Sequence, residues 1–211
     1  SNDCMIDFHE KNIIESGDII ILTNCFGHLY DIDEVEAKLK NKIIIYDNAA
    51  SPYSFFKDKN SCNYGVGSFI SLHHTKPIGF GEGGLAIIDR EYEKYTRAAV
   101  NFGIEEGVFN ENGGNYKISE LSAAGILQWW DQFDIDELAN KYVDNYEGDF
   151  WPNHGDDKFF PNCLPFIHKD PTNISELDGK EVKKYYRPLR GFPISTFIYD
   201  RISCISLSEG L

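Results

Sequence analysis

The chain has 211 residues, and its 34 acidic residues outnumber its 20 basic residues to give a formal net charge of −14 at pH 7. Phosphate groups would repel such a chain, which disfavours partners such as nucleic acid or an anionic membrane surface. Hydrophobic residues make up 42% of the sequence, enough for a packed core. No apolar run approaches about eighteen residues, so we expect no membrane-spanning helix.

The five cysteines are widely spaced and odd in number. They show neither a CxxC pair nor the spacing of metal ligands. We therefore interpret them as reduced thiols of a cytoplasmic protein. The first residues lack the basic and apolar regions of a signal peptide, which agrees with that localisation.

The first hundred residues predict strands that alternate with helices. Asp31 is placed to cap a helix that runs to residue 40, because Glu34 follows three positions later as in a capping box. A further helix is expected over residues 91–102, closed by Gly103. Four apolar runs are typical of buried strands: residues 19–22, 43–46, 66–72 and 85–88. This alternation predicts an α/β sheet that binds ligands at the carboxyl ends of its strands.

The pattern changes in the second half of the chain. Ser119 is expected to cap a long helix that extends or restarts toward residue 146. Residues 148–162 are rich in Gly, Pro, Asn and Asp, which is typical of a linker. We therefore predict a large α/β domain over residues 1–147 and a small C-terminal α+β lobe over residues 148–211. Three segments of this lobe are expected to be ordered: residues 164–168, 175–185 and 194–202.

One lysine stands in an unusual setting. Lys76 lies just past the strand predicted over residues 66–72 and is followed by a glycine-rich turn and another strand. A buried lysine beside anion-binding groups is a candidate Schiff-base residue, because desolvation favours the neutral amine. From spacing alone, a surface lysine in a turn is the commoner interpretation.

The residues around Lys76 suggest two other kinds of site, and neither is favoured. Glycines at positions 79, 81 and 84 match GxGxxG, but a strand rather than a helix is predicted to follow, which argues against a dinucleotide site. His73 and His74 are predicted to point to opposite sides of a strand. This would keep them from lining one metal site, so we expect no metal.

Three ordered segments resemble the DegT/DnrJ/StrS family of sugar aminotransferases, which are fold-type I enzymes dependent on pyridoxal 5'-phosphate (PLP). The segment SLHHTKPIGFGEGGLAIID is similar to the family's cofactor-lysine region. IIIYDNAASPYS is similar to a family strand that ends in an aspartate, and NYKISELSAAGILQ to a family helix start. The resemblance covers nearly all of the chain from about Ile19 and implies that the family's N-terminal third is lacking.

The resemblance implies roles for four residues. Lys76 would carry PLP covalently, and Asp47 would face the pyridine nitrogen and keep it protonated. Ser71 would bind the cofactor phosphate, and Asn115 would reach the phosphate in a neighbouring subunit, which implies a homodimer. For each residue, an ordinary structural role as a cap, strand-end or loop residue is the alternative.

By this resemblance the chain transfers an amino group, with glutamate as the donor, to a nucleotide-linked keto-sugar for polysaccharide biosynthesis. Two alternatives stay open. One is a truncated, catalytically impaired member that keeps the fold and the dimer interface. The other is a PLP-dependent sugar dehydratase, in which a histidine replaces the lysine, so Lys76 favours the aminotransferase.

Two positions depart from the family pattern. Lys117 stands where the family has an arginine, which removes a bidentate anion fork. Ala50 stands where a polar residue often contacts the cofactor ring. Ser51 is the neighbour that would have to replace it.

Overall fold

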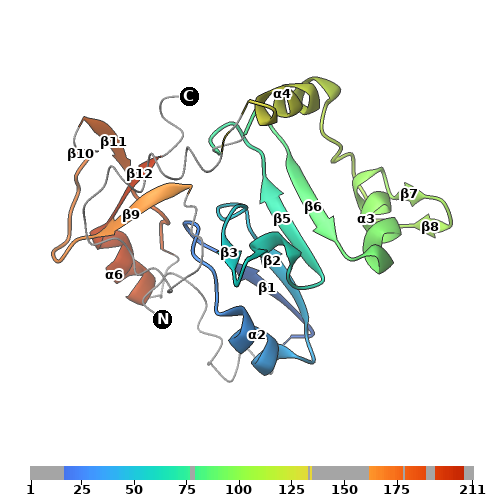
Figure 1. Ribbon diagram of the computed structural model, residues 1–211, viewed down its shortest axis with the longest axis horizontal. Helices are drawn as coiled ribbons and strands as arrows, with labels where there is room; N and C mark the ends of the chain where they lie inside the picture. Colours follow the sequence, from blue (N-terminus) through green and yellow to red (C-terminus); the bar gives the residue numbers. More distant parts are fainter. Residues whose placement is uncertain are drawn as a thin grey trace.

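The computed structural model describes residues 17–76, 79–132, 134, 162–177, 179–188 and 193–206. These residues form a four-stranded sheet in the N-terminal half and a second four-stranded sheet near the C-terminus (Figure 1). The mixed α/β architecture is as predicted, whereas the expected domain boundary at residues 147/148 lies outside the described residues. Among the helices described, none combines the length and apolar character needed to cross a membrane.

The first sheet has the strand order β1-β2-β5-β6. Its strands are β1 (Ile19–Thr23), β2 (Ile43–Asp47), β5 (Gly67–Ser71) and β6 (Gly84–Ile88). The first three run parallel, and β6 runs antiparallel to β5. The register pairs Asp47 with Thr23 on one side and with Phe69 on the other. The carboxyl ends of the three parallel strands therefore meet at one edge of the sheet.

Helix α2 (Ile32–Leu39) covers one face of this sheet. Asp31 caps it as predicted, because its Oδ1 accepts a hydrogen bond from the backbone N–H of Glu34 at 3.0 Å. The apolar side of α2 packs on alternate residues of β1 and β2. The cluster contains Ile20, Leu22, Ile32, Val35, Leu39, Ile44 and Tyr46. Each large side chain contributes about 1.5–3 kcal/mol on full burial, so this face anchors the strand that ends in Asp47.

The prediction that β1 and β6 are buried strands is wrong for one face of β1 and for most of β6. Ile19 and Ile21 are 57% and 58% exposed, and Leu85 and Ile87 are 48% and 41% exposed. A continuous apolar run is typical of a strand covered on both faces. Within the described part of the chain these side chains lack such a cover.

The remaining elements between residues 48 and 132 are helices, 3-10 turns and short paired strands. The single helix expected over residues 91–102 is a 3-10 turn, η2 (Arg90–Tyr92), followed by α3 (Glu93–Val100). Helix α4 (Glu120–Trp130) is capped as predicted by Ser119, which accepts a hydrogen bond from the backbone N–H of Ser122. Figure 1 shows α4 beyond the carboxyl end of β5. The short elements are β3 (Phe55–Phe56), β4 (Lys59–Asn60), η1 (Ser61–Asn63), β7 (Ile104–Glu105) and β8 (Val108–Phe109).

The C-terminal sheet is antiparallel, with the order β10-β11-β12-β9. Its elements are β9 (Cys163–Ile167), β10 (Glu176–Leu177), β11 (Lys180–Lys183), α6 (Pro193–Arg201) and β12 (Ile202–Ser206). Together they form the α+β unit on the left of Figure 1. Cys25 and Phe26, which follow β1, pack into its core with Cys163, Ile198, Ile202 and Cys204. The lobe is therefore joined to the strand ends that carry the predicted site.

Candidate active site

A chain of buried polar side chains ties the carboxyl ends of β1 and β2 to the first half of β5. Asn24, just after β1, donates from Nδ2 to Asn48 Oδ1 at 2.7 Å, and Asn48, just after β2, donates from Nδ2 to Ser68 Oγ at 2.8 Å. All three residues are fully buried. An unpaired buried polar group is costly, so the network holds the strand ends in place. The sequence analysis missed these residues, although Asn24 and Asn48 each stand just after a predicted strand, which was the available signal.

Asp47 is the last residue of β2 and is half-buried at this edge. Its Oδ1 accepts a hydrogen bond from the backbone N–H of Ala49 at 3.0 Å, and its Oδ2 accepts one from the hydroxyl of Thr23 at 3.3 Å. These two bonds orient the carboxylate. Because a carboxylate oxygen accepts more than one hydrogen bond, Asp47 keeps acceptor capacity for a protonated ligand.

Lys76 lies on a tight hairpin between β5 and β6. Its backbone N–H donates to the carbonyl of His73 at 2.8 Å, and its own carbonyl accepts from the N–H of Gly79 at 2.9 Å. A Cβ on Gly79 would lie 1.7 Å from the His73 carbonyl oxygen, so the hairpin requires glycine there. Because β6 begins at Gly84, a strand follows the glycines, in agreement with the argument against a dinucleotide site.

The side chain of Lys76 shares an electrostatic environment with Asp47 and Cys163. Burial lowers the pKa of the Lys76 amine, while the influence of Cys163 and of Asp47 acts in the opposite direction. A lowered pKa increases the neutral fraction of the amine, which is the form that attacks a carbonyl carbon. The fold thus brings together a lysine and an aspartate from two different strand ends.

Cys163, the first residue of β9, is a neighbour that the sequence analysis did not single out. A hydrogen bond with Cys204 and burial raise the pKa of the Cys163 thiol well above its ordinary value, so Cys163 stays a neutral thiol. None of the four described cysteines forms a disulfide bond. The spacing of the cysteines in the sequence gave no sign that Cys163 lies near Lys76, because β9 belongs to the C-terminal lobe.

Ser71 ends β5, the strand next to the one that ends in Asp47. Its Oγ accepts a hydrogen bond from the backbone N–H of His73 at 3.3 Å, which leaves the hydroxyl proton for an anionic ligand. Asn115 lies on a separate, exposed segment, where its backbone forms a β-bridge with Asn101. The structure therefore places Ser71 beside the site and Asn115 on a different element.

The structure shows which contacts surround the two positions that depart from the family pattern. Ser51 is fully buried, and its Oγ accepts from the N–H of Gly27 and donates to the carbonyl of Asn24, both at 2.9 Å. The proton of its hydroxyl is therefore used within the fold. Lys117 donates to Asn101 Oδ1 at 2.7 Å, which holds its ammonium near the Asn115 segment.

The position of His73 and His74 corrects the prediction made for them. Both residues follow β5 rather than belong to it, and their ring centroids lie 4.0 Å apart. Side chains alternate between two faces only within a strand. The stated reason against a shared metal site is therefore wrong.

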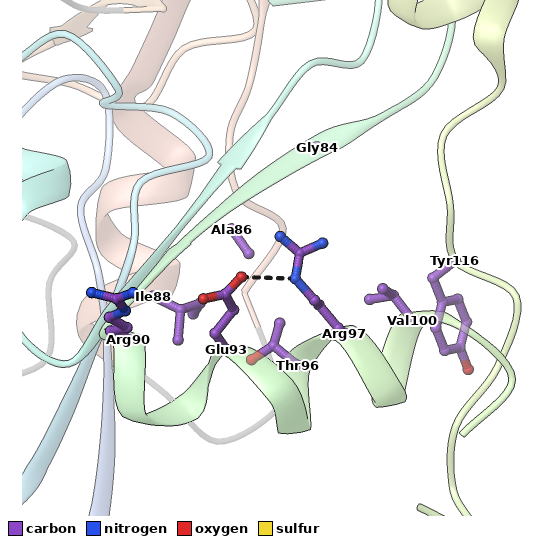
Figure 2. Close-up of a pocket in the computed structure, with 9 residues that line it drawn as sticks. All are labelled: Gly84, Ala86, Ile88, Arg90, Glu93, Thr96, Arg97, Val100 and Tyr116. Carbon is purple, nitrogen blue, oxygen red and sulfur yellow. Dashed lines mark hydrogen bonds and ion pairs between the residues drawn. The ribbon is translucent and has the colours of Figure 1, made fainter. Parts of the chain in front are cut away.

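A pocket of about 590 Å³ lies between β6 and α3 (Figure 2). An ion pair from Arg97 Nε to Glu93 Oε1, 2.9 Å long, lies along its helical wall. Its lining residues are Gly84, Ala86, Ile88, Arg90, Glu93, Thr96, Arg97, Val100 and Tyr116. None of the four predicted site residues is among them, so we place the active site at the strand ends instead.

The fold is that of solved sugar-modifying enzymes. A DegT DnrJ EryC1 StrS aminotransferase from Brucella abortus superimposes with a TM-score of 0.73 at 19% identity, covering 89% of this chain and 58% of its own. Helicobacter pylori PseC, an aminotransferase of pseudoaminic acid biosynthesis, gives 0.76 at 18%, covering 99% and 67%. A GDP-4-keto-6-deoxymannose-3-dehydratase with a trapped PLP-glutamate geminal diamine gives 0.70 at 15%, covering 97% and 68%.

These likenesses define a fold of PLP-dependent transferases, of which the chain spans about three fifths to two thirds by length. The sequence profile of the DegT/DnrJ/EryC1/StrS aminotransferase family matches residues 2–138, more than half of the chain. The chain belongs to this family. PLP is the cofactor of such enzymes, and the residues present fit it. They offer an amine that burial shifts toward its neutral form at Lys76 and an oriented carboxylate at Asp47.

Proposed function

We propose that the protein is a PLP-dependent sugar aminotransferase whose cofactor is held by Lys76 and Asp47. The observation that carries the proposal is the shared environment of these two side chains at the strand ends, since they stand far apart in the sequence. When bound, PLP supplies an electron sink that stabilises negative charge on the neighbouring carbon. The protein residues position that group and move protons.

Asp47 would hold a proton on the pyridine nitrogen. Its carboxylate is already oriented by Thr23 and Ala49, so no rearrangement is required when the ring binds. Lys76 would have two tasks: it would hold the cofactor, and its amine would move a proton between two carbons as general base and acid. The partial burial that favours its neutral amine suits both tasks.

Ser71 and Asn115 are the proposed phosphate ligands. The hydroxyl of Ser71 is available beside the site, whereas Asn115 is exposed on another segment. An exposed position is suited to a residue that acts in a second copy of the chain. We therefore include a homodimer in the proposal.

For the substrates we propose glutamate as amino donor and a nucleotide-linked keto-sugar as acceptor. The support is family membership and the sugar chemistry in the names of structural relatives. A dehydratase is among those relatives, but the presence of Lys76 favours amino transfer. A catalytically impaired member is the second candidate, because Ala50 lacks a polar side chain and the hydroxyl proton of Ser51 is used within the fold.

The test is covalent capture of PLP. The protein is mixed with PLP, treated with borohydride and digested, and we expect the modified peptide to contain Lys76. Lys76→Ala should abolish both the absorbance band and the captured peptide, whereas Lys94→Ala, an exposed lysine on α3, should leave them unchanged. A reducible linkage that survives in Lys76→Ala would refute the assignment.

A second measurement separates the candidate functions. The PLP-loaded protein is mixed with glutamate, and 2-oxoglutarate is measured in a single turnover. An aminotransferase releases it and, with a keto-sugar acceptor, then forms an amino-sugar. A dehydratase relative also combines PLP with glutamate, so the sugar product separates the two: a dehydratase would form a deoxy-sugar, and an impaired member would form neither sugar.

A further inference from the structure

His73, His74 and Glu82 form a compact cluster on the hairpin that carries Lys76. One nitrogen of each imidazole and one carboxylate oxygen all lie within 4.8 Å of one another. His73 Nε2 is 3.4 Å from Glu82 Oε1. In the described part of the chain, no other three His, Cys, Asp or Glu side chains meet this spacing.

The backbone of the hairpin holds these side chains opposite one another. The N–H of Leu72 donates to the carbonyl of Gly83, and the N–H of His74 donates to the carbonyl of Gly81, both at 2.9 Å. These bonds continue the pairing of β5 and β6 past the strand ends. The two histidines therefore stand on one arm and Glu82 on the other, on a frame that is already formed.

The hydrogen bonds of His73 are compatible with metal ligation. Its Nδ1 lies 2.7 Å from Thr75 Oγ1. When Nδ1 carries the proton and donates it to that oxygen, Nε2 keeps a free lone pair on the side of Glu82. Metal-binding histidines commonly donate their second N–H to an oxygen in this way. In the other tautomer Nε2 carries the proton, and Nδ1 accepts a longer hydrogen bond of 3.3 Å from the backbone N–H of Thr75. Metal binding at Nε2 would favour the first tautomer.

We propose that His73, His74 and Glu82 bind a divalent first-row transition metal ion, with zinc as the best match. Two imidazoles and one carboxylate form a ligand set that zinc prefers and that leaves a fourth position for water. Calcium and magnesium prefer oxygen ligands. The net charge of −14 also favours a cation.

The geometry needs only a small adjustment. Zinc bonds of about 2.0–2.2 Å in a tetrahedron hold the donor atoms about 3.3 Å apart, so the widest pair has to close by at most about 1.5 Å. The side chain of Glu82 is 81% exposed and is free to make this movement. The bound ion would join the two arms of the hairpin on which Lys76 lies.

The experiment uses the whole chain without PLP, after treatment with a chelator. Calorimetric titration with Zn²⁺ should detect binding that Glu82→Gln and His74→Ala each weaken by at least about tenfold, which corresponds to about 1.4 kcal/mol. Glu106→Gln is the matched control, because Glu106 is an exposed carboxylate in the β7–β8 turn. We expect this variant to change the zinc affinity by less than about twofold, because surface substitutions away from a site usually have effects within about 0.5 kcal/mol.

Cobalt substitution identifies the ligand atoms. Co²⁺ should give visible d–d bands without a thiolate charge-transfer band, because the cluster contains no cysteine. Three results would each overturn the proposal: a thiolate band, zinc affinities of Glu82→Gln and His74→Ala that equal that of the parent, or no zinc binding by the parent. His74 and Glu82 are exposed, so circular dichroism of the variants should match the parent. No PLP is present, so these outcomes are independent of the proposed aminotransferase activity.

Discussion

Replacing Asn48 with alanine should destabilise the strand ends that position Asp47. Asn48 makes two buried side-chain hydrogen bonds, one with Asn24 at 2.7 Å and one with Ser68 at 2.8 Å. Hydrogen bonds between neutral groups contribute about 0.5–1.5 kcal/mol each, and a buried group left without a partner costs about 1–3 kcal/mol. Since the alanine leaves two such groups, we expect the free energy of unfolding to fall by about 2–6 kcal/mol.

Urea unfolding, followed by circular dichroism, measures this change as a lower transition midpoint. The matched control is Asn112→Ala, because Asn112 is exposed in a turn. A surface substitution of this kind usually changes stability by less than about 0.5 kcal/mol. The comparison separates loss of the buried network from a general effect of removing an amide.

A double-mutant cycle with Ser68→Ala tests the network itself. If Asn48 and Ser68 interact, the double variant should lose less stability than the sum of the two single losses, by about 0.5–3 kcal/mol. Additive losses, or a loss below about 1 kcal/mol for Asn48→Ala alone, would refute the reasoning. Either result would mean that the strand ends keep their positions without the amide chain.

Three further predictions follow from the site and its surroundings. Asp47→Asn should lower aminotransfer from glutamate by orders of magnitude, because the ring nitrogen loses its charged partner; rates within a few-fold of the parent would make Asp47 only structural. Ser119→Ala should lower the free energy of unfolding by about 1 kcal/mol through loss of the α4 cap, and an unchanged urea midpoint would contradict it. Exposed apolar residues such as Ile21 and Leu85 should make the isolated chain self-associate. If Asn115 of a second copy supplies one charge-assisted hydrogen bond of about 1.5–3 kcal/mol, PLP should bind the monomer about 10–100-fold more weakly than the dimer. Sedimentation with calorimetry tests this last prediction, and a monomer that binds PLP as tightly as the dimer would refute it.

The sequence by itself determined the features that depend on neighbouring residues. The apolar runs located the strands of the first sheet to within a residue or two. Asp31 and Ser119 located two helix starts, because a cap acts over only three residues. The placement of Asp47 and Lys76 just at or after strand ends came from the same local pattern. Resemblance to a family, rather than spacing, attached a chemical role to them.

Only the tertiary structure decided which of these local pieces meet. The antiparallel pairing of β6 and the exposure of Ile21 depend on what lies beside each strand. The approach of Cys163 to Lys76 depends on how the C-terminal lobe packs against the first sheet. His73 and His74 come together because both lie past the end of β5 at Ser71, where side chains no longer alternate between two faces. Such contacts join residues that are distant in sequence or lie past an element boundary, and local periodicity carries no information about either.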